Sequence, residues 1–430
     1  MPRCQRRRVS RGCRDRSGRS AMNHDHPGTR WSSGIVPAQP PRVGVLVHQL
    51  NRHLTGVGRY MASLTAELCR RDDGIDVFPL VVGPLGVLES DPRVHARITT
   101  DPVVRRALAL TQHSSRFVGH RASFLTMGST LAAIAARRLQ LDVLHDLTGV
   151  APFLLPTGPC RRVITIHDVI SFLPKGGNDL VDDSLQRCWL PRAARRADGI
   201  ITVSATTGAD VQRLLHVPAD RVHVARHGVD SRYRLLSRDD CEPTLHRYRI
   251  SPGYILFVGA TSPRKNLAKL LEACRLIWAG GRPTKLVIVG PAQPRGLPAL
   301  ADDLATGRIN SLGYVAEADL PALYNAAAVL AFPSSYEGFG LPALEAMSCG
   351  TPVLAGRAGA LPEIVGAAGV LADPSDVHAL AREIVSLLDD SGRRSRLREL
   401  GLRRAHSFTW SRSAAETTEI YRHVLRIPDP

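Results

Sequence analysis

The 430 residues are too many for one ordinary hydrophobic core, which favours two domains of roughly 150 to 200 residues each. A content of 44% hydrophobic and 22% charged residues is typical of a globular protein and excludes a fibrous or wholly disordered chain. The net charge of +17 suggests a nucleic-acid ligand, but residues 1–42, with ten arginines and two acids, supply +8 of it.

Residues 1–41 are predicted to form a disordered basic tail, because Arg, Ser, Gly and Pro dominate them without an apolar period. They contain no apolar stretch of a secretory signal, and an organelle transit peptide is the alternative that their arginines leave open. Beyond the tail, apolar runs are too short to span a bilayer, and the eight cysteines are scattered without a Cys-x-x-Cys pair. We therefore expect a soluble or peripheral protein in the cytoplasm, with reduced thiols.

Short β-branched runs alternate with amphipathic stretches in two successive series, which is the pattern of βαβ units and parallel sheets. The first series has expected strands at 43–48, 77–82, 143–145, 163–166 and 200–203, with helices such as 60–70 and 207–215. The second has expected strands at 254–258, 285–289, 329–331 and 353–355, with helices near 267–277, 320–326 and 343–348. The C-terminal part is expected to be helical only, at 377–388, 397–405 and 414–424.

This order predicts an α/β fold with two Rossmann-like domains, at 42–235 and 250–408, joined by a linker over 231–250 and followed by a helix within 409–430. Open parallel sheets bind ligands at the carboxyl ends of their strands. The chemistry is therefore expected in a cleft between the two halves.

Two segments of the first half are candidates for that cleft. The run Gln49-Leu-Asn-Arg-His-Leu-Thr-Gly56-Val-Gly58-Arg59-Tyr60 joins the first strand to its helix. It is not a dinucleotide fingerprint, since Met61 stands where the third glycine belongs, and its glycines alone are compatible with a simple turn. The run Thr165-Ile-His167-Asp168 ends an apolar strand and so places His167 at the carboxyl edge of the first sheet, although an isolated histidine is more often structural.

The second half contains a basic turn and a longer run that opens a helix. In Val258-Gly-Ala-Thr-Ser-Pro-Arg-Lys-Asn266, a strand ends at Gly259 and delivers Arg264 and Lys265 to the cleft; a solvated basic turn is the alternative. The longer run is Phe332-Pro-Ser-Ser-Tyr-Glu337-Gly-Phe-Gly-Leu-Pro342-Ala-Leu-Glu345-Ala-Met-Ser-Cys-Gly350-Thr-Pro352.

In this longer run, Pro342 suits a first helical turn and Gly350 suits a helix exit. Gly338 and Gly340 allow backbone N–H groups close to a ligand, and a helix N-terminus favours an anion such as a diphosphate. Glu337 on the loop and Glu345, expected in the first turn, are both able to accept hydrogen bonds from sugar hydroxyls. Taken separately, each acid also fits a purely structural role.

The whole run resembles the Glu-x7-Glu signature of family-4 glycosyltransferases, with Gly-Phe-Gly-Leu-Pro and Ala-Met-Ser-Cys-Gly-Thr-Pro also in pattern. The resemblance extends over nearly the whole chain after residue 42, and its Gly-Val-Gly-Arg-Tyr form is most similar to the mannosyltransferase branch. It implies the GT-B architecture, in which two Rossmann-like domains face each other across a cleft. The segment Phe408-Thr-Trp410-Ser resembles the family's terminal segment, whose helix crosses back to the first domain.

The resemblance also implies a set of roles for individual residues. Glu337 would hold the donor hexose, Glu345 the ribose hydroxyls, and His167 the transferred sugar. The leaving diphosphate would be bound by Lys265 and Arg264 and by the amides of Phe339, Gly340 and Leu341, with Gly56, Gly58 and Gly259 allowing close approach to the donor. Ala260 stands where the family form has Arg, and His227, which has no assigned role, stands where it has Asn.

The implied reaction retains the anomeric configuration and needs no carboxylate nucleophile, metal or cofactor; the sequence also lacks an Asp-x-Asp metal clamp. GDP-mannose is favoured as the donor, and the acceptor is expected to be a glycan or a lipid-linked glycan contacted by residues 83–140. Residues 105–110 fit either a surface helix or a peripheral contact with the inner face of a membrane. Three alternatives stay open: a nucleotide-sugar epimerase of the same fold, a basic nucleic-acid-binding protein, and a catalytically inactive scaffold.

Overall fold

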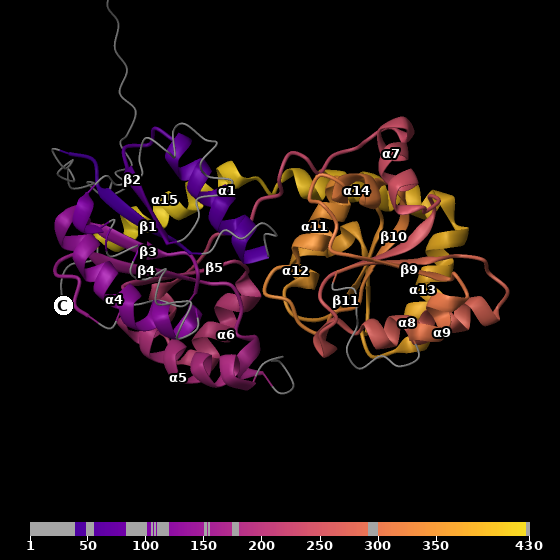
Figure 1. Cartoon of the computed structure of the whole chain (residues 1–430), viewed down its shortest axis with the longest axis horizontal. Helices are drawn as coiled ribbons and strands as arrows, with labels where there is room; N and C mark the ends of the chain where they lie inside the picture. The colour runs from indigo at the N-terminus through magenta and orange to yellow at the C-terminus, as the bar shows by residue number, and fades with distance from the viewer. Residues whose placement is uncertain are drawn as a thin grey trace, which may run out of the picture. The chain divides into compact units, whose positions relative to one another are not determined.

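The computed structural model describes residues 39–48, 56–82, 101–104, 106, 109, 120–149, 153, 155–173, 180–290 and 300–426. Within these residues the chain forms two β-sheets of six strands each, and every strand pairing is parallel (Figure 1). The predicted α/β fold with two Rossmann-like sheets is therefore confirmed. Almost all of the predicted basic tail lies outside the described residues, as do most of residues 83–119 of the expected acceptor region 83–140. In the part of the chain that is described, no helix is long and apolar enough to cross a membrane.

The first sheet has the strand order β2-β1-β3-β4-β5-β6. Its strands are β1 (Arg42–His48), β2 (Asp76–Val82), β3 (Val143–Asp146), β4 (Arg161–Ile166), β5 (Gly199–Thr202) and β6 (Val222–Val224). Its helices are α1 (Gly56–Arg70), α4 (His120–Arg138), α5 (Leu180–Arg196) and α6 (Ala205–Leu215). Helices α4, α5 and α6 bury their apolar residues against one face of the sheet, and α1 packs on the other face.

The second sheet has the order β12-β11-β10-β7-β8-β9, which is the Rossmann strand order. Its strands are β7 (Tyr254–Val258), β8 (Leu286–Val289), β9 (Ile309–Gly313), β10 (Ala327–Phe332), β11 (Val353–Gly356) and β12 (Val370–Ala372). The associated helices are α8 (Leu267–Ala279), α9 (Leu300–Ala305), α10 (Leu320–Ala326), α11 (Leu341–Ser348), α12 (Leu361–Val365), α13 (Val377–Asp389) and α14 (Ser391–His406). Helices α8 and α13 cover one face, while α10, α11 and α12 cover the other.

The last helix, α15 (Trp410–Arg426), returns to the first sheet, as the sequence predicts. Its buried side chains join the apolar cluster of β1 and α1. The hydroxyl of Tyr421 lies 2.7 Å from Nδ1 of His145, whose Nε2 lies 2.8 Å from the Thr165 hydroxyl; Tyr60 OH reaches the same hydroxyl at 2.9 Å. This buried polar network fixes the helix to the sheet, because each of its members would be costly to leave without a partner.

The predicted linker over 231–250 contains helix α7 (Arg238–Tyr248), which the sequence analysis did not predict. The Ser237 hydroxyl accepts a hydrogen bond from the Asp240 backbone N–H, and the Asp240 carboxylate accepts one from the Ser237 N–H, so the helix starts with a capping box. Cys241 and Leu245 pack into the core of the second half. The segment between the sheets is therefore partly a packed helix.

The strand orders identify the edges at which ligands are expected. In the second sheet the order reverses between β7 and β10, and in the first sheet between β1 and β3. Open parallel sheets bind ligands outside the carboxyl ends of their strands at such reversal points. The segments after β7 and β10 are the basic turn and the Glu337 loop, and the segment after β1 leads into α1.

Candidate active site

A cavity of about 880 Å³ lies at these strand ends and is lined by residues of both halves. Nearly all of the predicted site residues line it: Gly56, His167, Gly259, Arg264, Lys265, Glu337, Phe339, Gly340, Leu341 and Glu345. Gly58 is the exception, because it is buried within the first turn of α1 and does not line the cavity. The preceding residues 49–55 of the glycine loop lie outside the described residues. We refer to this cavity below as the cleft.

The two predicted cations meet on one carboxylate. Lys265 Nζ lies 2.6 Å and Arg264 Nη1 2.9 Å from the same oxygen, Oε1 of Glu337. The cations are held by a short 3₁₀ turn, Pro263–Lys265, which Asn266 closes in the left-handed conformation with φ 53°. The Asn266 side chain then donates to the carbonyl oxygen of Pro333, 2.9 Å away, which fixes the basic turn to the loop after β10.

Burial and charge act in opposite directions on this cluster. Burial raises the pKa of Glu337, but the charges of Lys265 and Arg264 outweigh it and hold that pKa below the ordinary value. Burial also lowers the pKa of Lys265; Glu337 opposes this effect and Arg264 adds to it, so that the net shift is downward. The cluster is a charged centre with little solvent around it, in which a ligand anion would interact strongly with both cations.

The loop after β10 passes very close to the first half of the chain. A Cβ atom on Gly338 would lie 1.9 Å from the carbonyl oxygen of His167, which only a glycine avoids. The Gly338 carbonyl in turn accepts hydrogen bonds from the hydroxyls of Ser204, at 2.7 Å, and Thr207, at 3.0 Å. Gly338 thus joins the two halves at the cleft, a role beyond the predicted approach to a ligand.

Helix α11 begins beside the cluster with the features that the sequence predicts. Gly340 has φ 110° at the N-cap position, and Pro342 lies in the first turn. A helix N-terminus directs positive potential outward. In the first turn of α11, Pro342 has no N–H, and the N–H groups of Ala343 and Leu344 donate to the Gly340 carbonyl oxygen. Glu345, however, is the fifth helical residue, so its expected place in the first turn is wrong; its carboxylate is almost fully buried and accepts from Tyr324 OH at 2.8 Å.

Two histidines also line the cleft. His167 donates from Nε2 to the carbonyl oxygen of Leu147, 2.8 Å away, which makes Nδ1 the acceptor nitrogen; Nδ1 is buried and has no protein partner. Burial lowers the pKa of His167 to about 4, so the ring is neutral at pH 7. The ring of His227 lies between those of Tyr60 and Phe339, with centroids 4.7 and 4.6 Å away, and neither of its nitrogens has a partner.

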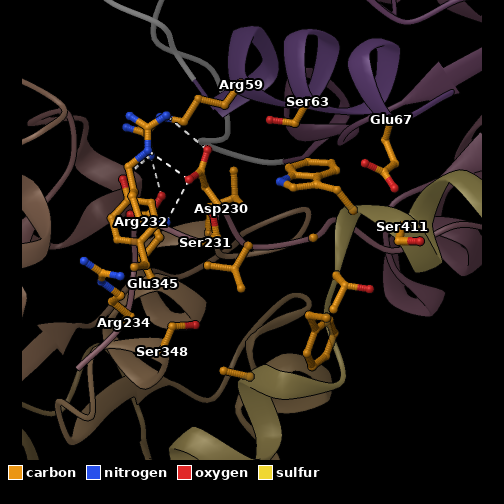
Figure 2. Close-up of a pocket in the computed structure, with 18 of the residues that line it drawn as sticks. Arg59, Ser63, Glu67, Asp230, Ser231, Arg232, Arg234, Glu345, Ser348 and Ser411 are labelled. Atoms are coloured by element: carbon orange, nitrogen blue, oxygen red, sulfur yellow. Dashed lines mark hydrogen bonds and ion pairs between the residues drawn. The ribbon is translucent and has the colours of Figure 1, made fainter. Parts of the chain in front are cut away.

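The cleft also contains charged residues that the sequence analysis missed: Arg59, Asp168 and Glu317. Arg59 is the most prominent, because its guanidinium pairs with Oε1 of Glu345 across the cleft. It belongs to the Gly-Val-Gly-Arg-Tyr motif, but nothing in that motif indicates a partner 286 residues away. An adjoining pocket of about 1090 Å³ shares Arg59 and Glu345 with the cleft, and Figure 2 shows both among its lining side chains.

Chemically, the cleft combines paired cations, a helix N-terminus and neutral or anionic acceptors. The cations and amides suit a leaving diphosphate, and the carboxylates and imidazoles suit sugar hydroxyls. Among the described residues, no group of three or more His, Cys, Asp or Glu side chains is arranged to hold a metal ion. The individual residue roles stay predictions.

Comparison with known proteins agrees with this chemistry. A family model described as glycosyltransferase family 4 matches residues 54–233, and one described as glycosyl transferases group 1 matches residues 249–404. The O-antigen chain mannosyltransferase B of Escherichia coli is 36% identical over 285 residues, which cover 63% of this chain and 72% of that protein.

A second relative matches nearly end to end: the MMP alpha-(1->4)-mannosyltransferase of Mycolicibacterium hassiacum is 28% identical over 422 residues, covering 89% of this chain and 98% of the relative. Among solved structures, HepE of Anabaena in complex with UDP and glucose superposes with a TM-score of 0.64 at 18% identity, over 88% of this chain and 98% of HepE. At that identity the superposition shows a shared fold.

Proposed function

Because this chain belongs to glycosyltransferase family 4, we propose that it transfers a hexose from a nucleoside diphosphate sugar to an acceptor hydroxyl, with retention of configuration and without a metal ion. That it is a glycosyltransferase follows from the family. The donor, the stereochemistry and the metal independence are the proposed part.

The observation that carries this proposal is the contact of Lys265 and Arg264 with Glu337 beside the N-terminus of α11. Cleavage of a glycosyl phosphate bond develops negative charge on the departing diphosphate and positive charge on the sugar. The two cations and the amides of Phe339, Gly340 and Leu341 would stabilise the phosphate, while Glu337 would hold the hexose. One cleft would thus stabilise the charge on the phosphate and bind the sugar.

In the proposed reaction the acceptor oxygen bonds to the anomeric carbon as the bond from that carbon to the phosphate oxygen breaks. The acceptor proton passes to the departing phosphate oxygen on the same face, so no enzyme carboxylate forms a covalent intermediate. Neutral His167 would accept a hydrogen bond from a sugar hydroxyl through Nδ1. Positive charge from the side chains would take the place of a metal ion.

Mannose is the proposed sugar, with GDP-mannose as the donor. Both relatives described above are named as mannosyltransferases, and several further relatives are serotype-specific mannosyltransferases of Escherichia coli. HepE, by contrast, is a structural neighbour that binds UDP and glucose, so the base and sugar have to be measured. The proposed acceptor is a glycan or a lipid-linked glycan, reached in the cytoplasm or at the inner face of a membrane.

The test is a transfer assay with GDP-mannose and UDP-glucose in the presence of EDTA, using mannose-terminated oligosaccharides as acceptors and NMR to assign the new linkage. The expected product is α-linked, formed from the α-linked GDP-mannose, and Glu337→Gln should abolish it. A β-linked product would contradict retention. Activity that appears only after Mg²⁺ or Mn²⁺ is added would contradict metal independence.

A further inference from the structure

Arg59 is the charged side chain that α1 contributes to the cleft. Its guanidinium forms an ion pair with Oε1 of Glu345, its Nε lies 3.4 Å from Glu317, and its Nη1 donates to Tyr233 OH at 3.2 Å. All of these partners follow the first sheet in the chain. Arg59 therefore links α1 to the carboxylate that the family resemblance assigns to the donor ribose.

Both oxygens of that carboxylate are already engaged. Oε1 of Glu345 contacts Arg59, and Oε2 accepts a hydrogen bond from Tyr324 OH at 2.8 Å. The Glu345 side chain is only 3% exposed, whereas that of Arg59 is 25% exposed. A ribose that approaches Glu345 from the cleft thus meets Arg59 first, and Arg59 is the partner with room to move.

The charge balance of the cleft also favours a movement of Arg59 away from Glu345. Its described lining contains the cations Arg59, Arg264 and Lys265 and the carboxylates Asp168, Glu317, Glu337 and Glu345. The cations are fewer than the carboxylates, and each cation contacts a carboxylate. An anionic diphosphate is therefore accommodated best if an existing ion pair changes partner.

We propose that Arg59 is a donor-binding residue that exchanges partners, leaving Glu345 for the diphosphate as the ribose hydroxyls take its place on Glu345. This inference rests on the proposed nucleoside diphosphate sugar donor. A guanidinium suits the exchange, because it stays charged and presents a fork of N–H donors that matches phosphate as well as carboxylate. Arg59 lies one helical turn after Gly56, in the N-terminal part of α1. This part of α1 lines the same cleft as Lys265 and Gly340.

The exchange would couple donor binding to the contact between the two halves. Without donor, Arg59 of α1 pairs directly with Glu345 of α11. With donor, the two side chains would be connected through the nucleotide. A ligand that makes different contacts in the two arrangements shifts their populations by the difference in its affinity for them.

The experiment is isothermal titration calorimetry of the full chain in EDTA with GDP and UDP, and with the monophosphate and nucleoside of the base that binds. Arg59→Gln should weaken diphosphate binding about 10- to 100-fold, the range expected for losing hydrogen bonds to a charged group. It should leave nucleoside binding unchanged or tighter, since Glu345 becomes accessible. Arg59→Lys, which retains the charge without the fork, should lose less.

Arg232→Gln is the matched control. Arg232 pairs with Asp230 and with Glu317 in the same cluster but lines only the adjoining pocket, so its removal should leave diphosphate affinity unchanged. Circular dichroism and the melting temperature of each variant establish that it is folded.

Three results would overturn the inference about Arg59. Unchanged or tighter diphosphate binding by Arg59→Gln would mean that Arg59 does not bind the diphosphate and only competes with the ribose for Glu345. An equal loss of affinity for diphosphate and nucleoside would mean that Arg59 only maintains the structure of the pocket. Failure of the wild-type chain to bind either nucleotide would overturn the proposed function as well. The first two results, in contrast, would overturn only the inference about Arg59.

Discussion

Lys265 and Arg264 both pair with Oε1 of Glu337. Because either cation can pair with this carboxylate alone, single and double variants test different things. Removing both cations would leave Glu337 charged and buried, which costs about 3–5 kcal/mol of stability when one side of a buried pair is lost. Removing Lys265 alone leaves Arg264 on the carboxylate. The single variant therefore separates catalysis from folding better than the double variant does.

For Lys265→Ala we expect kcat to fall about 10²- to 10³-fold, the effect of losing one donor that stabilises transition-state charge. The melting temperature should change less than in the Lys265→Ala, Arg264→Ala double variant. Steady-state kinetics with saturating donor measures this directly. Lys269→Ala is the control, because Lys269 pairs with Glu272 on the exposed side of α8. A kcat equal to wild type in Lys265→Ala would remove Lys265 from the mechanism.

At the scale of elements, the loop before α11 depends on its contact with the end of β4. Gly338→Ala would place a methyl group where the His167 carbonyl oxygen now lies, so one of the two loops has to move. Because a displacement of about 1 Å in an active site costs about 10²-fold in rate, we expect kcat/KM to fall by about that factor. Gly280→Ala, whose added Cβ would have no neighbour closer than 3.4 Å, should keep its activity. Equal kcat/KM values for the two variants would contradict the role of this contact.

Helix α15 is held to the first sheet by the Tyr421–His145 hydrogen bond in addition to its apolar face. Tyr421→Phe leaves a buried imidazole nitrogen without a partner and should lower the free energy of unfolding by about 1–3 kcal/mol. Urea denaturation monitored by fluorescence tests this. Tyr314→Phe, at a residue that is 69% exposed, should lower it by less than Tyr421→Phe does. A loss no larger than this in Tyr421→Phe would show that apolar packing alone anchors the helix.

The sequence predicts well the elements that an apolar run and turn residues delimit, and poorly the strands of only three residues. The strand 254–258 and the helix 320–326 are confirmed at both ends, because apolar runs and turn residues delimit them. Strands β6 and β12, of three residues each, are too short for a periodic pattern to be recognised. Helix α7 was missed because Pro243 inside it argues against a helix and its charged surface shows little amphipathic pattern.

The candidate site was predictable where its residues follow the ends of parallel strands in the same sheet. The position of Glu337 beside Lys265 follows from parallel strands ending at one edge, and the motif resemblance selects the residues. Arg59, by contrast, meets Glu345 only through the packing of α1 near α11, and no local pattern encodes that contact. Glu345 was assigned to the wrong turn because α11 starts at Leu341, two residues before the start expected from sequence.

For the whole molecule, buried neutral histidines predict a loss of stability in mild acid. Burial lowers the pKa of His145 to about 3, and it holds that of His227 well below the usual value. Above pH 6.5 neither the folded nor the unfolded state protonates them. As the pH falls below 6.5, the unfolded state binds protons that the folded state excludes, so the free energy of unfolding drops by about 1.4 kcal/mol per pH unit for each histidine.

Urea denaturation at pH 7.5, 6.5 and 5.5 measures this slope. His227→Asn should reduce it by the share of one histidine. If the slope is the same in wild type and His227→Asn, His227 is protonated in the folded state and the account of its burial is wrong.

The central claim is that the cleft binds a nucleoside diphosphate sugar without a metal ion. The most direct test is the thermal stabilisation of the protein by GDP, UDP, GDP-mannose and UDP-glucose in EDTA, for wild type and Glu345→Gln. A ligand at a hundredfold excess over its dissociation constant stabilises the folded state by about 2.7 kcal/mol. We predict a response to one base, GDP with GDP-mannose, that Glu345→Gln diminishes. No response to any of the four ligands, or a response that Glu345→Gln leaves intact, would contradict the account.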